Sequence, residues 1–165
     1  MPAGPPSTPD PVITAIDNVY VRFSWTAPAS NGADITAYYL WILKADGFTL
    51  AKSDSCDHVS DPLIIDNQEC LIAMSELTDA STYGLPQGRL VSAKLQAENS
   101  AGISDYSSYN TVSVLVEVVP HAVPNLVRGA LTTQTELDVD WDDFANQSAR
   151  GGLTASIISY KVEWD

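Results

Sequence analysis

Apolar and polar residues alternate with a period of two along much of this chain. Between residues 18 and 25 every second residue is apolar, and residues 90–98 repeat this alternation. Residues 35–44 are rich in β-branched and aromatic side chains, which are typical of strands. A period of two buries one face of a strand, so these segments are predicted to be half-buried β-strands. The same criteria place further strands at residues 48–51, 69–75 and 113–119.

Turns separate the predicted strands at regular intervals. Residues 27–32 contain Pro, Asn and Gly, residues 77–88 contain two glycines and a proline, and residues 99–102 end on Gly102. Such clusters mark turns and loops. No segment shows the 3.6-residue period of a helix, so no helix is expected. With a first strand ahead of the one that ends at Trp25, seven short strands joined by turns predict an all-β sandwich.

The pattern begins again after residue 119. Residues 137–141 alternate like the strand that ends at Trp25, and a Gly-rich turn follows at residues 150–152. Residues 157–162 then match residues 35–40 in spacing. Aligning the two copies pairs Trp25 with Trp141, Tyr38 with Tyr160 and Leu40 with Val162. The chain therefore carries an internal repeat of about 116 residues, which is a sign of tandem modules.

Both copies share a Trp at the end of one strand, a Pro- or Gly-containing turn and the spacing Ile-x-x-Tyr-x-Leu/Val. The first copy adds Ala97-x-Asn99-x-x-Gly102-x-Ser104. These features resemble the fibronectin type III family, and the tandem copies are similar to the repeats of large secreted or surface proteins. The resemblance covers residues 8–118 as a whole domain and residues 122–165 as the first strands of another. It implies an immunoglobulin-like β-sandwich with adhesion, spacing or scaffold roles and without catalysis.

The predicted organisation follows from this resemblance. We expect a Pro-rich lead-in at 1–10, a fibronectin type III-like domain at 11–118, a linker at 119–125 and an incomplete second domain at 126–165. The incomplete copy is either part of a longer chain or completed by strands from a neighbouring molecule. Val91 stands where the family places the Tyr of its tyrosine corner, and Tyr83 is expected to supply the corresponding packing.

Charge and hydropathy narrow the classes of partner. The net charge is −13, from 21 acidic and 8 basic residues, which disfavours binding to nucleic acid or to anionic lipid. No run approaches the roughly 20 apolar residues of a membrane helix, so no membrane insertion is predicted for this segment. The first residues lack a basic region and an apolar run. If the protein is secreted, its signal is therefore expected to lie outside this sequence.

The chain has two cysteines, Cys56 and Cys70, on either side of a predicted loop. A disulfide across this loop would add about 3 kcal/mol to stability and would indicate an oxidising compartment. Two unpaired thiols are the alternative. Two cysteines fall short of the four ligands that a structural zinc site needs.

Candidate catalytic and metal-binding residues are few. His58 and His121 are the only histidines, and both are predicted to be solvated, one in the cysteine loop and one in the linker. No nucleophile elbow, phosphate-binding loop or dinucleotide fingerprint is present. Three aspartates, Asp138, Asp140 and Asp142, share one face of a predicted strand, but their spacing of roughly 7 Å is wide for one Ca²⁺. We predict no enzyme activity, no metal and no cofactor.

Two surface features point to modification and contact. Asn146 begins the sequon Asn-Gln-Ser and is a candidate for N-glycosylation, and residues 5–9 offer Ser and Thr for O-linked sugars. Unmodified loops are the alternative.

If Tyr38, Leu40 and Ile42 face the core, their neighbours Tyr39, Trp41 and Leu43 form an outward apolar stripe, which is typical of a contact site. Cover by a neighbouring strand or by the Lys94 stem is the alternative.

The sequence as a whole predicts a structural module of an extracellular or cell-surface fibre, filament or coat. Its expected partners are other copies of itself or neighbouring repeats, with glycans attached covalently. An adhesion or ligand-binding module for protein or carbohydrate is the first alternative, and an accessory domain of a secreted enzyme is the second.

Overall fold

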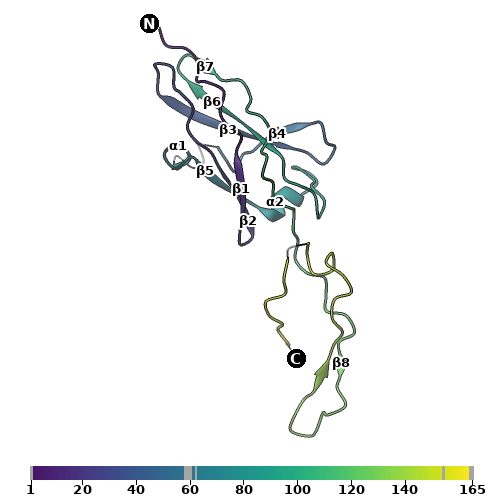
Figure 1. Ribbon diagram of the computed structural model, residues 1–165. Helices are drawn as coiled ribbons and strands as arrows, with labels where there is room; N and C mark the ends of the chain where they lie inside the picture. Colours follow the sequence, from purple (N-terminus) through teal and green to yellow (C-terminus); the bar gives the residue numbers. More distant parts are fainter. Residues whose placement is uncertain (1, 58–60, 62, 154, 164–165) are drawn as a thin grey trace. The chain divides into compact units, whose positions relative to one another are not determined.

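A computed structural model describes residues 2–57, 61, 63–153 and 155–163. The chain divides into two compact units, Met1–Val116 and Glu117–Asp165. Among the described residues, the first unit carries seven strands in two antiparallel sheets, and the second carries a two-stranded ribbon (Figure 1).

The two sheets of the first unit are built from strands that turn one apolar face inward. One sheet has the order β1-β2-β5, with strands at Ile13–Asp17, Tyr20–Ser24 and Glu69–Ala73. The other has the order β4-β3-β6-β7, with strands at Leu50–Lys52, Ile35–Leu43, Ala93–Asn99 and Gly102–Ile103. This arrangement is the predicted all-β, immunoglobulin-like sandwich.

The core lies between these sheets. It contains Val21, Phe23 and Ile72 from the first sheet and Leu40 and Leu95 from the second. Because side chains alternate across a strand, their sequence neighbours face outward. Trp25 closes the core after β2, and its ring lies 5.1 Å from that of Tyr38, measured between centroids. Tyr83 and Val91 are also fully buried, so Tyr83 does pack into the core.

The predicted strand at 18–25 is interrupted at its start. Asn18 has a positive φ of 54° and forms a two-residue turn with Val19, between β1 and β2. Turns that join antiparallel strands through two residues need such left-handed backbone, which Asn tolerates well. Val19, which the alternation assigned to the core, is therefore 65% exposed.

Two short helices contradict the expectation that the chain has none. α1 spans Leu63–Asn67 within the predicted cysteine loop, and α2 spans Met74–Thr78, where a strand end and a loop were expected. Each has five residues, which is too short to show a helical period. Buried contacts hold them in place, through Ile64 in α1 and through Met74 and Leu77 in α2.

The predicted strand at 113–119 is also wrong. Only Leu115 makes a ladder contact, an isolated bridge to Leu90. Two further backbone hydrogen bonds join the same two segments on either side of this bridge, from Gly88 N to Val116 O and from Val91 N to Val114 O. The partner segment contains the turn at residues 86–89, so it is too short and too bent to support a regular ladder.

Residues 2–10, the described part of the predicted lead-in at 1–10, pack on the first unit. Gly4 N donates to Asn31 O and Ser7 N donates to Ala29 O, at 3.0 and 2.9 Å. The Nδ2 group of Asn99 donates to the carbonyl oxygens of Gly4 and Ser30, both at 2.8 Å. The asparagine of the family-like motif thus ties the N-terminal segment to a turn.

The second unit forms less regular structure than the sequence predicts. β8 at Val127–Arg128 pairs antiparallel with β9 at Val139–Asp140, within the predicted strand at 137–141. The predicted strand at 157–162 is absent, since these described residues have no regular structure. In the first unit the matching strand, β3, is held from both sides by β4 and β6. The described part of 117–165 offers no such pair of partners, and an isolated strand is unstable in water.

Candidate partner-binding face

The outer surface of the β4-β3-β6-β7 sheet holds the predicted contact residues. Tyr39, Trp41 and Leu43 lie on β3 and are half-buried, whereas Tyr38, Leu40 and Ile42 between them are buried in the core. The inward and outward sides of β3 are therefore those that the alternation predicted. The outward residues are more covered than an open stripe would be.

Trp41 lies in the middle of this surface. Its neighbours in register are Lys52 on β4 and Lys94 on β6. Its ring meets that of Tyr106 edge-on, with centroids 5.7 Å apart and planes at 77°. The indole Nε1 is buried and has no hydrogen-bond partner among the described residues.

Two lysines lie against the aromatic rings. The Nζ atom of Lys94 lies 4.4 Å from the ring centre of Tyr109 and 5.9 Å from that of Tyr106. The Nζ atom of Lys52 lies 4.8 Å from the ring centre of Tyr39. Each such cation–π contact contributes about 0.5–1 kcal/mol at an exposed site. We call Tyr39, Trp41, Lys52, Lys94, Tyr106 and Tyr109 together the aromatic–lysine face.

Tyr39 is fixed at one end of this face. Its hydroxyl donates a hydrogen bond to the Glu98 carboxylate. That hydrogen bond, with burial and the nearby negative charge, raises the pKa of Tyr39 to about 12, because ionising the phenol would remove the donor and add a second anion. Tyr39 therefore remains neutral at physiological pH.

An irregular segment, residues 104–110, presents the two outer tyrosines. Every third residue in it turns inward and bonds to β6 with both backbone and side chain. Ser104, Ser107 and Asn110 accept the backbone N–H groups of Ala97, Leu95 and Ala93 at 2.8–3.0 Å. Their own N–H groups donate to the carbonyls of the same three residues. The period of three places Tyr106 and Tyr109 on the outer side, next to Lys94.

Sequence reasoning missed Tyr106, Tyr109 and Lys52. A signal for the tyrosines exists, because Ser-Asp-Tyr, Ser-Ser-Tyr and Asn110 recur every three residues. That period belongs to neither a helix nor a strand. The face can stack on planar or apolar groups and can pair with anions, but partner binding by Tyr39, Trp41 and Leu43 stays a prediction.

A disulfide joins the two cysteines. Cys56 and Cys70 have Cα atoms 5.6 Å apart, and both residues are buried. The bond connects the segment after β4 to β5, and so links the two sheets. The cysteine loop is therefore anchored in the core and contains α1.

The remaining candidate residues belong to other segments of the chain. Asn146 is exposed, and its Oδ1 accepts the Ala149 N–H at 2.9 Å, so its glycosylation stays a prediction. Asp138 accepts the Leu131 N–H through Oδ2. His121 is exposed, and His58 lies outside the described residues. Within the described ranges no three His, Cys, Asp or Glu side chains gather as metal ligands.

Neither of the two helices in the described part of the first unit, α1 and α2, with five residues each, has the length and apolar character that a membrane-spanning helix requires.

Comparison with solved structures identifies the fold. The FN1–FN3 domains of chicken CNTN1 align with 87% of this chain at a TM-score of 0.52 and 16% sequence identity. The fold is fibronectin type III-like. The chain spans 44% of the length of that CNTN1 fragment. A second similar structure is the sixth fibronectin type III domain of a human fibronectin type III domain-containing protein. The alignment covers 70% of this chain and 89% of that domain, at 19% sequence identity and a TM-score of 0.47. No protein-family model and no curated protein sequence matches.

The fibronectin type III-like fold accounts for the position of the aromatic–lysine face on the outer side of a sheet. Sandwich domains of this kind bury one face of each sheet and leave the other face and the loops for contact. The CNTN1 fragment carries several such domains in one chain. Its likeness at 16% identity concerns the fold, and the role of this chain has to be argued from its own residues.

Proposed function

We propose that this chain is a structural module of an extracellular fibre, filament or surface coat built from tandem fibronectin type III-like sandwiches. The observation that carries the proposal is a repeated aromatic pair. Trp25 lies 5.1 Å from Tyr38 in the first unit, and Trp141 lies 5.4 Å from Tyr160 in the second, between ring centroids. The sequence repeat aligns Trp25 with Trp141 and Tyr38 with Tyr160, so the two contacts involve equivalent residues. A packing feature found twice, at matching positions, supports two copies of one module.

Three further points support an extracellular location and a structural role. The buried Cys56–Cys70 disulfide suits an oxidising compartment. The strongly acidic composition keeps a module soluble in a medium whose salt screens self-repulsion. Domains of this fold are typically non-catalytic, and a spacer or scaffold needs no reactive group. Other copies or neighbouring repeats are the partners that this role requires, and Asn146 is the glycan site that we propose.

Electron microscopy of the native protein tests this role. Negatively stained material, purified at native ionic strength, should show strings of small globular modules joined in rows. The appearance should persist after mild deglycosylation, because protein modules and not sugars form the string. Dispersed compact particles with no serial modules would contradict the proposed function.

A further inference from the structure

The turn between β3 and β4 carries the most exposed aromatic ring of the first unit. Residues 44–49 read Lys-Ala-Asp-Gly-Phe-Thr, and an Asp-Gly pair between two strands is a strong turn signal. Phe48 in this turn is 81% exposed, whereas Phe23 and Phe144, the other two phenylalanines of the chain, are buried. Burying such a ring against a partner is favourable, because apolar surface then leaves water.

Local hydrogen bonds hold the backbone of this turn in one conformation. Lys44 N donates to Thr49 O at 2.8 Å, and Gly47 N donates to Lys44 O at 3.0 Å. The Asp46 carboxylate accepts the backbone N–H groups of Phe48 and Thr49 at 3.0 and 2.9 Å. Hydrogen bonds from the Thr49 side chain and from these N–H groups lower the pKa of Asp46, so the carboxylate stays ionised and keeps its partners. The ring is therefore presented by a preorganised turn, and such a turn loses little conformational freedom on binding.

Two basic side chains accompany Phe48. Lys44 begins the turn, and a guanidinium nitrogen of Arg89 lies beside Gly47, where a Cβ atom would be 3.6 Å from it. Among the described residues neither base forms an ion pair. With Asp46 included, two bases against one acid leave the turn with a net charge of +1, in a chain whose net charge is −13. The turn thus combines an exposed aromatic ring with a local positive charge.

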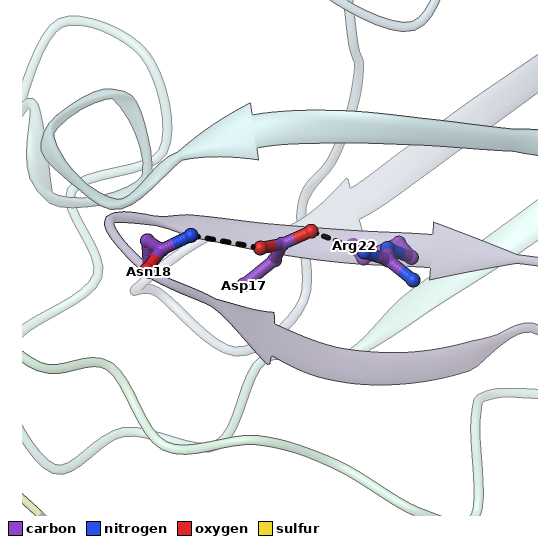
Figure 2. A network of polar contacts seen from close by, with 3 residues as sticks. All are labelled: Asp17, Asn18 and Arg22. Atoms are coloured by element: carbon purple, nitrogen blue, oxygen red, sulfur yellow. Dashed lines mark hydrogen bonds and ion pairs between the residues drawn. The ribbon is translucent and has the colours of Figure 1, made fainter.

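The other basic side chains of the first unit are already engaged. Figure 2 shows that the Arg22 guanidinium donates to the Asp17 carboxylate within its own hairpin. Lys52 pairs with Asp57 at 3.6 Å, and Lys94 lies against two tyrosine rings. The turn that carries Phe48 is therefore the part of the first unit whose cations are best able to meet a partner.

The second unit contains an open hollow of about 470 Å³. Its lining combines the apolar side chains of Leu153, Ile157 and Tyr160 with the ion pair between Asp143 and Arg150, which are 2.9 Å apart. Leu153 and Tyr160 are 67% and 43% exposed, so this lining is accessible to a neighbouring molecule. An apolar cavity of about 150 Å³ is enough to bind benzene, so one phenyl ring has ample room here.

We propose that Phe48 of one copy of this chain inserts into the hollow on the second unit of another copy. The ring would pack against Leu153 and Ile157, in the way that aromatic anchors fill pockets at interfaces. The bases of the turn would meet Asp143, whose side chain is 72% exposed. Residues 117–165 contain eight acidic and three basic residues, so the charge of the second unit is complementary to that of the turn.

This contact is heterologous, because the anchor and the hollow are different surfaces. Each copy can therefore give its own Phe48 and receive that of another, and such contacts continue from copy to copy into open assemblies. The inference rests on the proposed function and names a contact that would build the fibre or coat. A chain that stays monomeric would refute this contact alone, because rows of modules in electron micrographs would still support the proposed function.

Sedimentation equilibrium of the whole 165-residue chain tests the anchor. At about 0.15 M salt, which screens the repulsion between acidic copies, the unmodified chain should associate as its concentration rises. Phe48→Ala should weaken this association by roughly tenfold or more. Leu63→Ala removes another exposed apolar side chain of the first unit, at 57% exposure, and should leave it intact. A chain that is monomeric at every concentration, as when Phe48 fills the hollow of its own chain, or equal losses from both variants, would overturn the proposal.

A mixing experiment tests both halves of the contact. Leu153→Lys places a charge in the hollow and should abolish self-association, whereas Leu131→Lys, at a site of the same unit that is 79% exposed and outside the hollow, should not. Phe48→Ala retains the hollow and Leu153→Lys retains the anchor. Each variant alone should stay monomeric, and an equimolar mixture should form a 1:1 complex that grows no further. A mixture that stays monomeric would contradict the pairing of this ring with this hollow.

Discussion

Replacing Trp25 by alanine is expected to lower the free energy of unfolding of the first unit by about 3–5 kcal/mol. The indole is only 8% exposed and packs on Tyr38 between the two sheets. Truncation would leave a cavity that the surrounding strands cannot fill, because the two antiparallel sheets hold their spacing. Urea denaturation of the whole chain, followed by near-ultraviolet circular dichroism, measures this loss. Trp25→Phe should cost less, since it retains one aromatic ring in the same space.

Trp141→Ala is the matched control for this prediction. Trp141 makes the corresponding contact with Tyr160 but is 39% exposed, so its removal takes away less buried surface. It belongs to the other compact unit and is not part of the core cluster of the first. The unfolding transition of residues 2–116 should therefore shift by less than about 0.5 kcal/mol. Equal losses from Trp25→Ala and Trp141→Ala in that transition would contradict our description of the core.

Removing the disulfide is expected to have the second largest effect. The double variant Cys56→Ala, Cys70→Ala should lose about 3 kcal/mol of unfolding free energy, because the bond closes a loop of 14 residues in the unfolded chain. For a unit of this size the melting temperature should fall by about 10 °C. Differential scanning calorimetry measures both quantities.

Reducing agent provides the control for the disulfide prediction. Dithiothreitol should lower the melting temperature of the unmodified chain toward that of the double variant, and should leave the double variant unchanged. Because both cysteines are buried, reduction should require partial unfolding and should proceed slowly at low temperature. Identical melting of the reduced and oxidised chains would show that the bond does not stabilise the sandwich.

The parts of the fold that were predictable share one property. Burial alternates along all of β6, and along β3 from Tyr38 onward, because each strand turns one face to the core, and the burial of Tyr38, Leu40 and Leu95 follows that alternation. Trp25 and Tyr38 could be recognised because the local pattern around each recurs in the second copy, around Trp141 and Tyr160. Local pattern and tertiary packing agree at these positions, so the sequence alone was sufficient.

The parts that could not be predicted depend on contacts between distant segments. α1 and α2 have no recognisable period, and a few buried side chains stabilise them. In the pairing of residues 104–110 with β6, serine and asparagine side chains accept the N–H groups of β6, while backbone N–H groups of the segment donate to the carbonyls of β6. No rule based on periods of 2 or 3.6 residues detects such a segment.

The aromatic–lysine face was likewise predictable only in part from the sequence. Alternation along β3 predicted that Tyr39 and Trp41 point outward. It did not predict their cover by Lys52 and Tyr106, since these residues reach the face through strand register and through the three-residue period. The second copy carries Lys161 and Glu163 where the first has Tyr39 and Trp41, so this face belongs to the first unit and not to the shared module.

Stretching single molecules of the native full-length protein tests the central claim, that this chain is part of a series of equivalent sandwich modules. Each unfolding module should release about 400 Å of chain, from a repeat of about 116 residues at up to about 3.6 Å each. For the module with the disulfide, reduction should lengthen this step by about 50 Å, the length of its 14-residue loop. The account predicts several evenly spaced unfolding events per molecule. A single event, or steps that share no common length, would contradict it.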